Sequence, residues 1–182
     1  YEIIDQNSFE LVTSNKILTD DLSKLGLNSI NLPLGEVKVT RKVKALDIIV
    51  RTCASVNMLT QNKTRLFEEQ KIEYTLRTIR SLLHSANFDP QLKKLKINFK
   101  VIDHNSTEEN LKKIDNVFKK FNKDYKIINL DISKFEDQID KTNQRGENIT
   151  SNQMSNMANI HQSLIEAKKS EDLIYFVEDD YL

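Results

Sequence analysis

The chain has 182 residues, enough to bury one full hydrophobic core but not two independent ones. Its 27 lysines and arginines balance its 27 aspartates and glutamates, so no field of one sign draws the whole chain to nucleic acid or to a membrane surface. The single cysteine excludes an internal disulfide and no apolar run approaches the ~18 residues of a membrane span, so we expect a cytoplasmic protein with no transmembrane segment in this chain.

Residues 1–45 lack a regular rhythm of apolar segments. They contain short apolar pairs, Gly26, Gly35 and Pro33, and one stretch at 36–43 that can be extended. We interpret them as an N-terminal extension or the tail of a preceding domain, and residues 46–182 as the main domain.

From residue 46 onward, short β-branched runs alternate with helical stripes. Residues 46–50 and 97–102 predict buried strands. Between them, residues 64–85 predict an amphipathic helix that ends in a turn at 87–90, with the apolar positions Ile72, Leu76, Ile79 and Leu83.

The second half of the chain continues the alternation. Ser106 and Glu109 have the spacing of a capping box, which predicts the start of a second helix. A strand at 125–130, a polar functional loop at 131–150 and a helix at 152–168 follow, and a last strand covers 173–177. The apolar stripe of the third helix is expected to contain Met154, Met157, Ala158, His161, Leu164 and Ile165.

Strands that alternate with helices imply right-handed crossovers between parallel strands. The sequence therefore predicts an α/β fold, a three-layer α/β/α sandwich around a mostly parallel sheet.

Polar residues follow three of the predicted strands. Arg51 and Thr52 end the first strand, Asp103 ends the second, and Glu178, Asp179 and Asp180 end the fourth. In an open α/β sheet, ligands bind outside the carboxyl ends of the strands, where the strand order reverses. If the first and fourth strands are neighbours, these groups converge on one crevice.

The acidic cluster at 178–180 allows two interpretations. Adjacent carboxylates repel one another, so the cluster costs stability unless a cation or donor groups compensate. Oxygen ligands of this kind suit Mg²⁺ or Mn²⁺, which would in turn neutralise a diphosphate. The alternative is a solvated acidic turn.

The other polar groups are open to structural interpretations as well. Asp103 can accept a hydrogen bond from a base or ribose, or form a turn. Arg51 can pair with a phosphate, or be solvated. Cys53 has no base partner that the sequence identifies, and His161 is expected to be a packed histidine.

Several nucleotide-binding and catalytic motifs are absent from the sequence. There is no Gly-x-Gly-x-x-Gly after the first strand, no P-loop and no Gly-x-Ser-x-Gly elbow. These absences argue against a dinucleotide fold, a P-loop NTPase and an α/β-hydrolase.

Three segments together resemble family-2 glycosyltransferases of the GT-A fold. They are Leu46–Thr52, Val101–Thr107, with its Asp-x-Asn-Ser-Thr pattern, and Tyr175–Asp180, which ends in an Asp-x-Asp-like motif. The resemblance covers residues 46–182 and implies a Rossmann-like, nucleotide-sugar-binding half of a metal-dependent enzyme.

Carried over by position, the resemblance gives roles at the strand ends. Arg51 and Thr52 would hold the base and ribose, and Asp103 would contact the base. Glu178 would touch the ribose, and Asp180 would bind Mn²⁺ or Mg²⁺, with Asp179 between them.

The resemblance also assigns roles to residues of the third predicted helix and of the loop before it. Asn156 or Asn159 would lie near the diphosphate, and Arg145 and Gly146 lie in the loop that borders the donor sugar. The implied reaction transfers a sugar from a nucleoside-diphosphate sugar, in particular a UDP-sugar, to a glycan or other hydroxyl acceptor, as in polysaccharide biosynthesis.

The sequence also departs from the family. Glu178 replaces an Asp, and His104-Asn105 replaces the commoner acidic-Gly pair, in a family that has Gly or Asn at the second position. The family's acceptor site and catalytic base lie later in the chain, so we expect a fragment of a longer protein that other parts could hold at the inner face of the membrane.

Two other functions fit the same layout. A nucleotidyltransferase shares the metal chemistry but would have a Gly-rich loop after the first strand, where this chain has Cys53–Asn57. A non-catalytic phospho-receiver-like signalling module would have its acidic pair after the first strand and not after the last.

Overall fold

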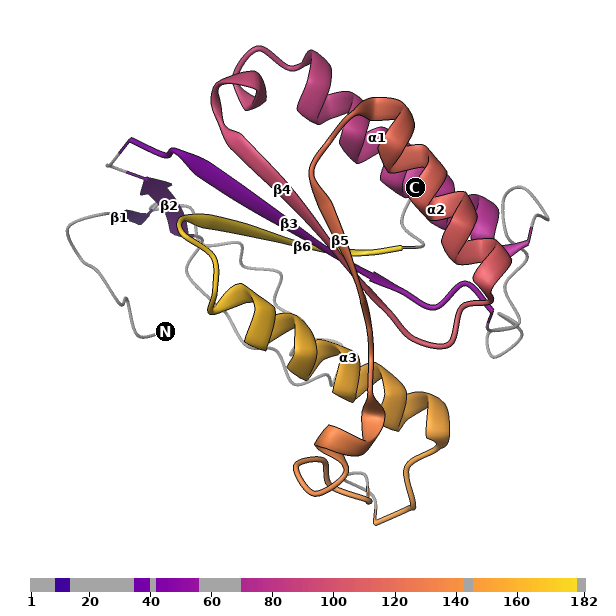
Figure 1. Ribbon diagram of the computed structural model, residues 1–182. Coiled ribbons are helices and arrows are strands. Elements are labelled where there is room, and N and C mark those ends of the chain that lie inside the picture. Colours follow the sequence, from indigo (N-terminus) through magenta and orange to yellow (C-terminus); the bar gives the residue numbers. More distant parts are fainter. Residues whose placement is uncertain (1–8, 14–34, 40–41, 56–69, 143–145, 180–182) are drawn as a thin grey trace, which may run out of the picture. The chain divides into compact units, whose positions relative to one another are not determined.

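The computed structural model describes residues 9–13, 35–39, 42–55, 70–142 and 146–179 (Figure 1). The chain divides into two compact units, residues 1–43 and 44–182. In the first unit, β1 (Phe9–Thr13) pairs antiparallel with β2 (Gly35–Val39), which overlaps the stretch predicted to be extended. Whether this unit is an extension or the tail of another domain stays a prediction.

The second unit is built on a four-stranded, all-parallel sheet. Its strands are β3 (Ala45–Thr52), β4 (Lys96–Asp103), β5 (Tyr125–Asn129) and β6 (Leu173–Glu178), in the spatial order β5-β4-β3-β6. All four lie where the sequence predicts them, within a few residues at each end. Because β6 pairs with β3 and not with β5, the first and last strands of the unit are neighbours.

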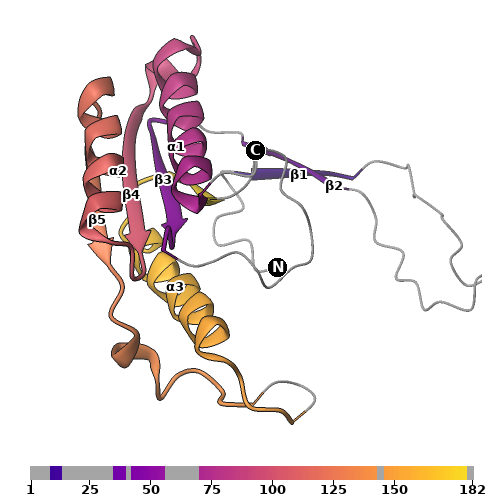
Figure 2. The same ribbon diagram turned by 90° about the vertical axis from the view of Figure 1, so that its right-hand side faces the viewer.

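Helices cover both faces of this sheet (Figures 1 and 2). α1 (Lys71–Phe88) and α2 (Glu108–Phe121) lie on one face, and α3 (Ser151–Ala167) lies on the other. Alternate residues of β3 serve the two layers, since Ile48 and Val50 pack with α1 and α2 while Ile49 lies in a separate cluster with Ala167. The predicted α/β/α sandwich is confirmed, and it is Rossmann-like.

The α1–α2 layer contains the larger core. The predicted stripe of α1 is confirmed, because Ile72, Leu76, Ile79 and Leu83 are all buried. On α2, Phe118 is fully buried with its ring centroid 5.4 Å from that of Phe99. The pairing of β3 with β4 places Thr52 opposite Asp103 at their carboxyl ends.

The predicted apolar stripe of α3 is wrong at three of its six positions, whereas Met154 and His161 are partly buried against the cluster around Phe135. Ala158 is buried, but Met157, Leu164 and Ile165 are 42–52% exposed. The face that packs on the sheet is formed by small and polar residues instead, namely Ser155, Ala158, Asn159, Ser163, Glu166 and Ala167. The sheet explains this, because its α3 face carries Asp47, Asn98 and Lys100, which need polar partners.

The described parts of the loop after β5 contain more regular structure than the sequence suggests. It contains a 3₁₀ turn (Ile132–Phe135) and a bridge between Thr142 and Asn148, and Phe135 and Ile139 are buried against Ala158. Gly146 adopts φ 77°, a left-handed conformation that glycine accepts readily. Among the helices that the structure describes, none is long and apolar enough to cross a membrane.

Candidate functional site

The strand order reverses between β3 and β6, and a cavity opens at their carboxyl ends. The chain adds β4 and β5 on one side of β3, and then returns through α3 to place β6 on the other side. The cavity has a volume of about 350 Å³ and is lined by Arg51, Thr52, Cys53, Lys71, His104, Asn105, Asn152, Ser155, Asn156, Asn159, Glu178 and Asp179. This is the position at which open α/β sheets bind ligands.

Three of the predicted site residues meet across this cavity. Arg51 donates one hydrogen bond to Asn156 Oδ1, at 3.1 Å, and forms an ion pair with the carboxylate of Glu178. The Glu178 side chain is 43% exposed, whereas that of Arg51 is only 15% exposed. The guanidinium is thus held between α3 and β6, with a carboxylate beside it that a ligand can reach.

Asp103 has a different environment from the one expected of a base-binding residue. It is 2% exposed and does not line the cavity. Its Oδ1 accepts hydrogen bonds from the hydroxyls of Thr52 and Ser106, both at 2.6 Å, and its Oδ2 accepts one from the Ser106 backbone N–H at 3.1 Å. Asp103 therefore fixes the end of β3 and the turn after β4, while Thr52 lies at the cavity wall.

Because of the hydrogen bonds of Asp103, the N-cap of α2 lies one residue later than the sequence predicts. Ser106 Oγ is engaged by Asp103 and by the backbone N–H of Ala54, at 2.9 Å. The N-cap is Thr107, whose Oγ1 accepts from the Asn110 N–H at 3.2 Å. The predicted capping box of Ser106 and Glu109 is wrong, because the buried carboxylate of Asp103 competes for the Ser106 hydroxyl.

Asp179, like Asp103, is a predicted site residue whose carboxylate is buried and accepts hydrogen bonds from other elements of the chain. It is 4% exposed, and its carboxylate accepts from Thr75 Oγ1 at 2.8 Å and from the Cys53 N–H at 3.3 Å. Lys71 Nζ lies 3.3 Å from its other oxygen. These contacts attach the start of α1 to the ends of β3 and β6.

Donor groups thus compensate two of the three adjacent carboxylates. Glu178 has Arg51 and Asp179 has Lys71, so the described part of the cluster is stabilised without a metal ion. Within the described residues, no group of three or more metal-binding side chains comes together. Two predicted site residues, Arg145 and the expected metal ligand Asp180, lie outside the described residues.

Sequence reasoning missed several residues of the cavity, of which Lys71 carries a charge. Lys71 begins α1, and its position beside β6 follows from the strand order, which the local sequence does not show. Sequence reasoning also gave Cys53 no base, yet His104 Nδ1 lies 4.0 Å from its sulfur and 2.7 Å from Ser155 Oγ. These contacts join β3, β4 and α3 around the cavity.

Asn159 lines this cavity and is 6% exposed. Its Nδ2 donates to the carbonyl of Ile102 at 3.2 Å, which connects α3 to β4. Its Oδ1 is buried, and no hydrogen-bond partner for this atom is found in the described part of the chain. An unpaired buried acceptor is costly, and this one lies inside the protein and not on the cavity surface.

Comparisons with known proteins found no protein-family model, no curated protein and no solved structure that matches this chain.

Proposed function

We propose that this cavity binds the nucleotide and diphosphate of a nucleoside-diphosphate sugar, and that the chain is the donor-binding part of a glycosyltransferase. The observation that carries the proposal is the strand-order reversal between β3 and β6, where Arg51, Asn156 and Glu178 come together. The reaction would transfer the sugar from a donor such as a UDP-sugar to a hydroxyl group of a glycan or other acceptor.

The chemistry of the cavity wall favours a polar, hydrogen-bonding ligand over an apolar one. Arg51 and Lys71 supply N–H donors, although each is paired with a carboxylate, and Asn105, Asn152 and Asn156 supply amides that can both donate and accept. A guanidinium binds phosphate oxygens well because its N–H groups match their geometry. Glu178 is exposed enough to accept hydrogen bonds from ribose hydroxyls.

The turn after β4 agrees with the family resemblance on physical grounds. Asn105 adopts φ 59°, in the left-handed region that favours glycine and that asparagine tolerates. The resembling family has Gly or Asn at this position, so the change to Asn105 preserves the turn. Asp103 supports the cavity from behind through Thr52, which makes it a positioning residue in this proposal.

Metal dependence remains part of the proposal through Asp180 alone. The carboxylates of Glu178 and Asp179 have cationic partners inside the chain, so the described residues do not by themselves form a ligand set for Mn²⁺ or Mg²⁺. The roles proposed for Arg51 and Asn156 do not require the metal.

Isothermal titration calorimetry with UDP, UDP-glucose, ADP and GDP, each with and without Mn²⁺, tests the proposal. We expect one-site binding of at least one nucleotide, weakened about tenfold in Arg51→Gln because a charge-assisted contact is lost. Arg77→Gln provides a control, since Arg77 lies on α1 and does not line the cavity.

The titrations distinguish the parts of the proposal. Equal affinity in Arg51→Gln and in the control would remove the cavity from nucleotide recognition. No heat with any nucleotide, with or without the metal, would refute donor binding as a whole. Binding that is insensitive to Mn²⁺ would refute only the part assigned to Asp180.

A further inference from the structure

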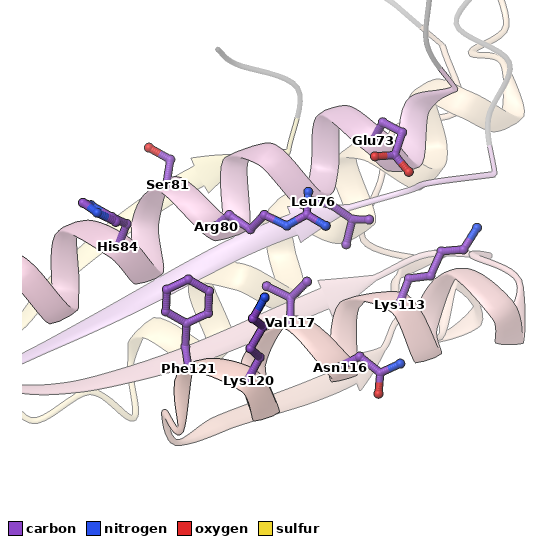
Figure 3. A pocket seen from close by; sticks show the side chains of 10 residues that line it. All are labelled: Glu73, Leu76, Arg80, Ser81, His84, Lys113, Asn116, Val117, Lys120 and Phe121. Atoms are coloured by element: carbon purple, nitrogen blue, oxygen red, sulfur yellow. The ribbon is translucent and has the colours of Figure 1, made fainter.

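A second and larger concavity lies between α1 and α2. Its volume is about 740 Å³, and it shares no lining residue with the cavity described above. Figure 3 shows side chains from the two helices facing each other across it. The lining residues are Glu73, Leu76, Arg80, Ser81, His84, Lys113, Asn116, Val117, Lys120 and Phe121, and we call this feature the α1–α2 groove.

The groove has an apolar floor between polar walls. Leu76 and Val117 form the bottom and are almost fully buried, at 4% and 8% exposure. Phe121, partly buried, points from α2 toward α1 (Figure 3). An apolar floor below a polar rim is the arrangement into which the apolar face of a partner helix packs.

The rim is positively charged. Arg80, Lys113 and Lys120 line the groove together with a single acidic residue, Glu73. Lys113 pairs with Glu109 at 2.8 Å, but Arg80 and Lys120 form no ion pair with any residue that the structure describes. Because the whole chain has zero formal net charge, this excess of cations is a local feature and not a consequence of composition.

The groove is elongated along α1. Its lining residues from Glu73 to His84 span about 16 Å of helix, at 1.5 Å per residue. Phe88 follows one turn after His84, with ring centroids 4.4 Å apart, and is the most exposed large apolar side chain described, at 61%. The apolar surface available to a partner thus extends beyond the groove to the end of α1.

From the shape and charge of this surface, we infer that the α1–α2 groove is a docking site for an acidic amphipathic helix of a partner protein. Apolar side chains spaced at i, i+4 and i+7 on that helix pack against Phe121 and Phe88, since Leu76 and Val117 expose little surface. Its flanking carboxylates pair with Arg80 and Lys120, which accounts for the two cations that lack a partner on the described surface. This inference does not depend on nucleotide binding.

The test is fluorescence anisotropy with a labelled peptide of about 15 residues, three to four helical turns. It carries leucines at the helical spacing and glutamates beside them. We expect saturable one-to-one binding that weakens about tenfold in Arg80→Glu/Lys120→Glu, because reversed rim charges repel the peptide. A peptide with lysines in place of the glutamates should bind the double variant more tightly than the natural chain.

Two further variants serve as controls. Lys112→Glu/Lys126→Glu makes the same change in net charge at exposed lysines outside the groove and should leave the affinity unchanged. Ser81→Trp changes no charge but places a large side chain at the exposed rim, and it should abolish binding by obstruction. The helical circular dichroism of each variant checks that the fold is intact.

The remaining outcomes overturn the inference. No saturable binding, or equal binding by the two charge-reversal variants, would show that the groove does not recognise an acidic helix. Adsorption to vesicles of anionic phospholipid that is lost in Arg80→Glu/Lys120→Glu, without binding of the peptide, would assign this surface to a membrane and exclude a protein partner.

Discussion

Asp103 and Asp179 show how buried carboxylates at strand ends can shape a cavity through hydrogen bonds within the chain. Each is less than 5% exposed, and each accepts hydrogen bonds from donors on other elements. Asp103 joins β3 to the turn after β4, and Asp179 joins α1 to β3 and β6. The sequence marks both as acidic residues after a strand, but which of them faces a cavity depends on donors far away in the chain, such as Thr75 and Lys71.

A third buried carboxylate, Asp47, gives the clearest dependence of stability on pH. Burial alone would raise the pKa of this carboxyl. Hydrogen bonds from Asn98, Lys100 and Ser170, at 2.6–2.8 Å, together with the charge of Lys100, lower the pKa below its usual value. Because folding lowers this pKa, ionised Asp47 stabilises the fold above its unfolded pKa of about 3.9, and that contribution is lost as the pH falls through the folded pKa.

We therefore expect Asp47→Asn to lower the free energy of unfolding by about 3 kcal/mol at pH 7, because Lys100 stays buried without its partner. As the pH falls through the lowered pKa of Asp47, the natural chain protonates this carboxyl and the difference should shrink. Urea unfolding at pH 7, 5 and 3 measures it, with Asp124→Asn at an exposed position as the control. A difference that stays constant over this range would contradict the account of Asp47.

At the scale of elements, predictability follows the chemistry of the buried face. The stripe of α1 was predictable because its face of the sheet is apolar, so burial and hydrophobicity coincide at Ile72 and Ile79. On α3, burial and hydrophobicity do not coincide, since Ser163 and Glu166 are buried while Leu164 is 52% exposed. The reason is the polar network on that face of the sheet, in which Lys100 donates to both Asp47 and the carbonyl of Glu166. A helical period in the sequence of α3 cannot show what lies opposite it.

Two substitutions on α3 separate the predicted stripe from the observed one. Ala158→Leu should destabilise the fold by about 1–3 kcal/mol, because Ala158 is fully buried and leaves no room for added methylene groups. Leu164→Ser should change stability by less than about 0.5 kcal/mol, since the side chain is half exposed. Thermal and urea unfolding of both variants measure the contrast. A larger loss of stability in Leu164→Ser than in Ala158→Leu would instead support the apolar stripe that the sequence predicts.

At the scale of the whole molecule, the sequence predicts the layers and the four strands, because each strand is a short β-branched run between helical periods. It leaves the strand order open. Arg51, Asn156 and Glu178 can converge only if β6 lies beside β3. The structure shows this strand order, whereas the local sequence does not indicate it. The order decides the site, since a strand added beside β5 would place Glu178 two strands farther from Arg51.

Contacts at the start of the sheet indicate which residues the second unit needs in order to fold alone. All of its described buried clusters lie within residues 44–182. The carboxylate of Asp172, just before β6, accepts from the backbone N–H groups of Lys44 and Ala45, at 2.7 and 3.3 Å. These bonds connect the start of β3 to the start of β6, so the boundary at residue 46 that the sequence suggests would remove both donors.

A chain that begins at Lys42 should therefore unfold in one cooperative urea transition. One that begins at Leu46 should be less stable by about 1–3 kcal/mol, because Asp172 loses both backbone donors. Circular dichroism during urea unfolding of the two shortened chains compares their midpoints. Equal midpoints would show that these bonds do not hold the edge strand to the sheet. Loss of the cooperative transition in both chains would show that residues 1–41 are needed for the second unit to fold.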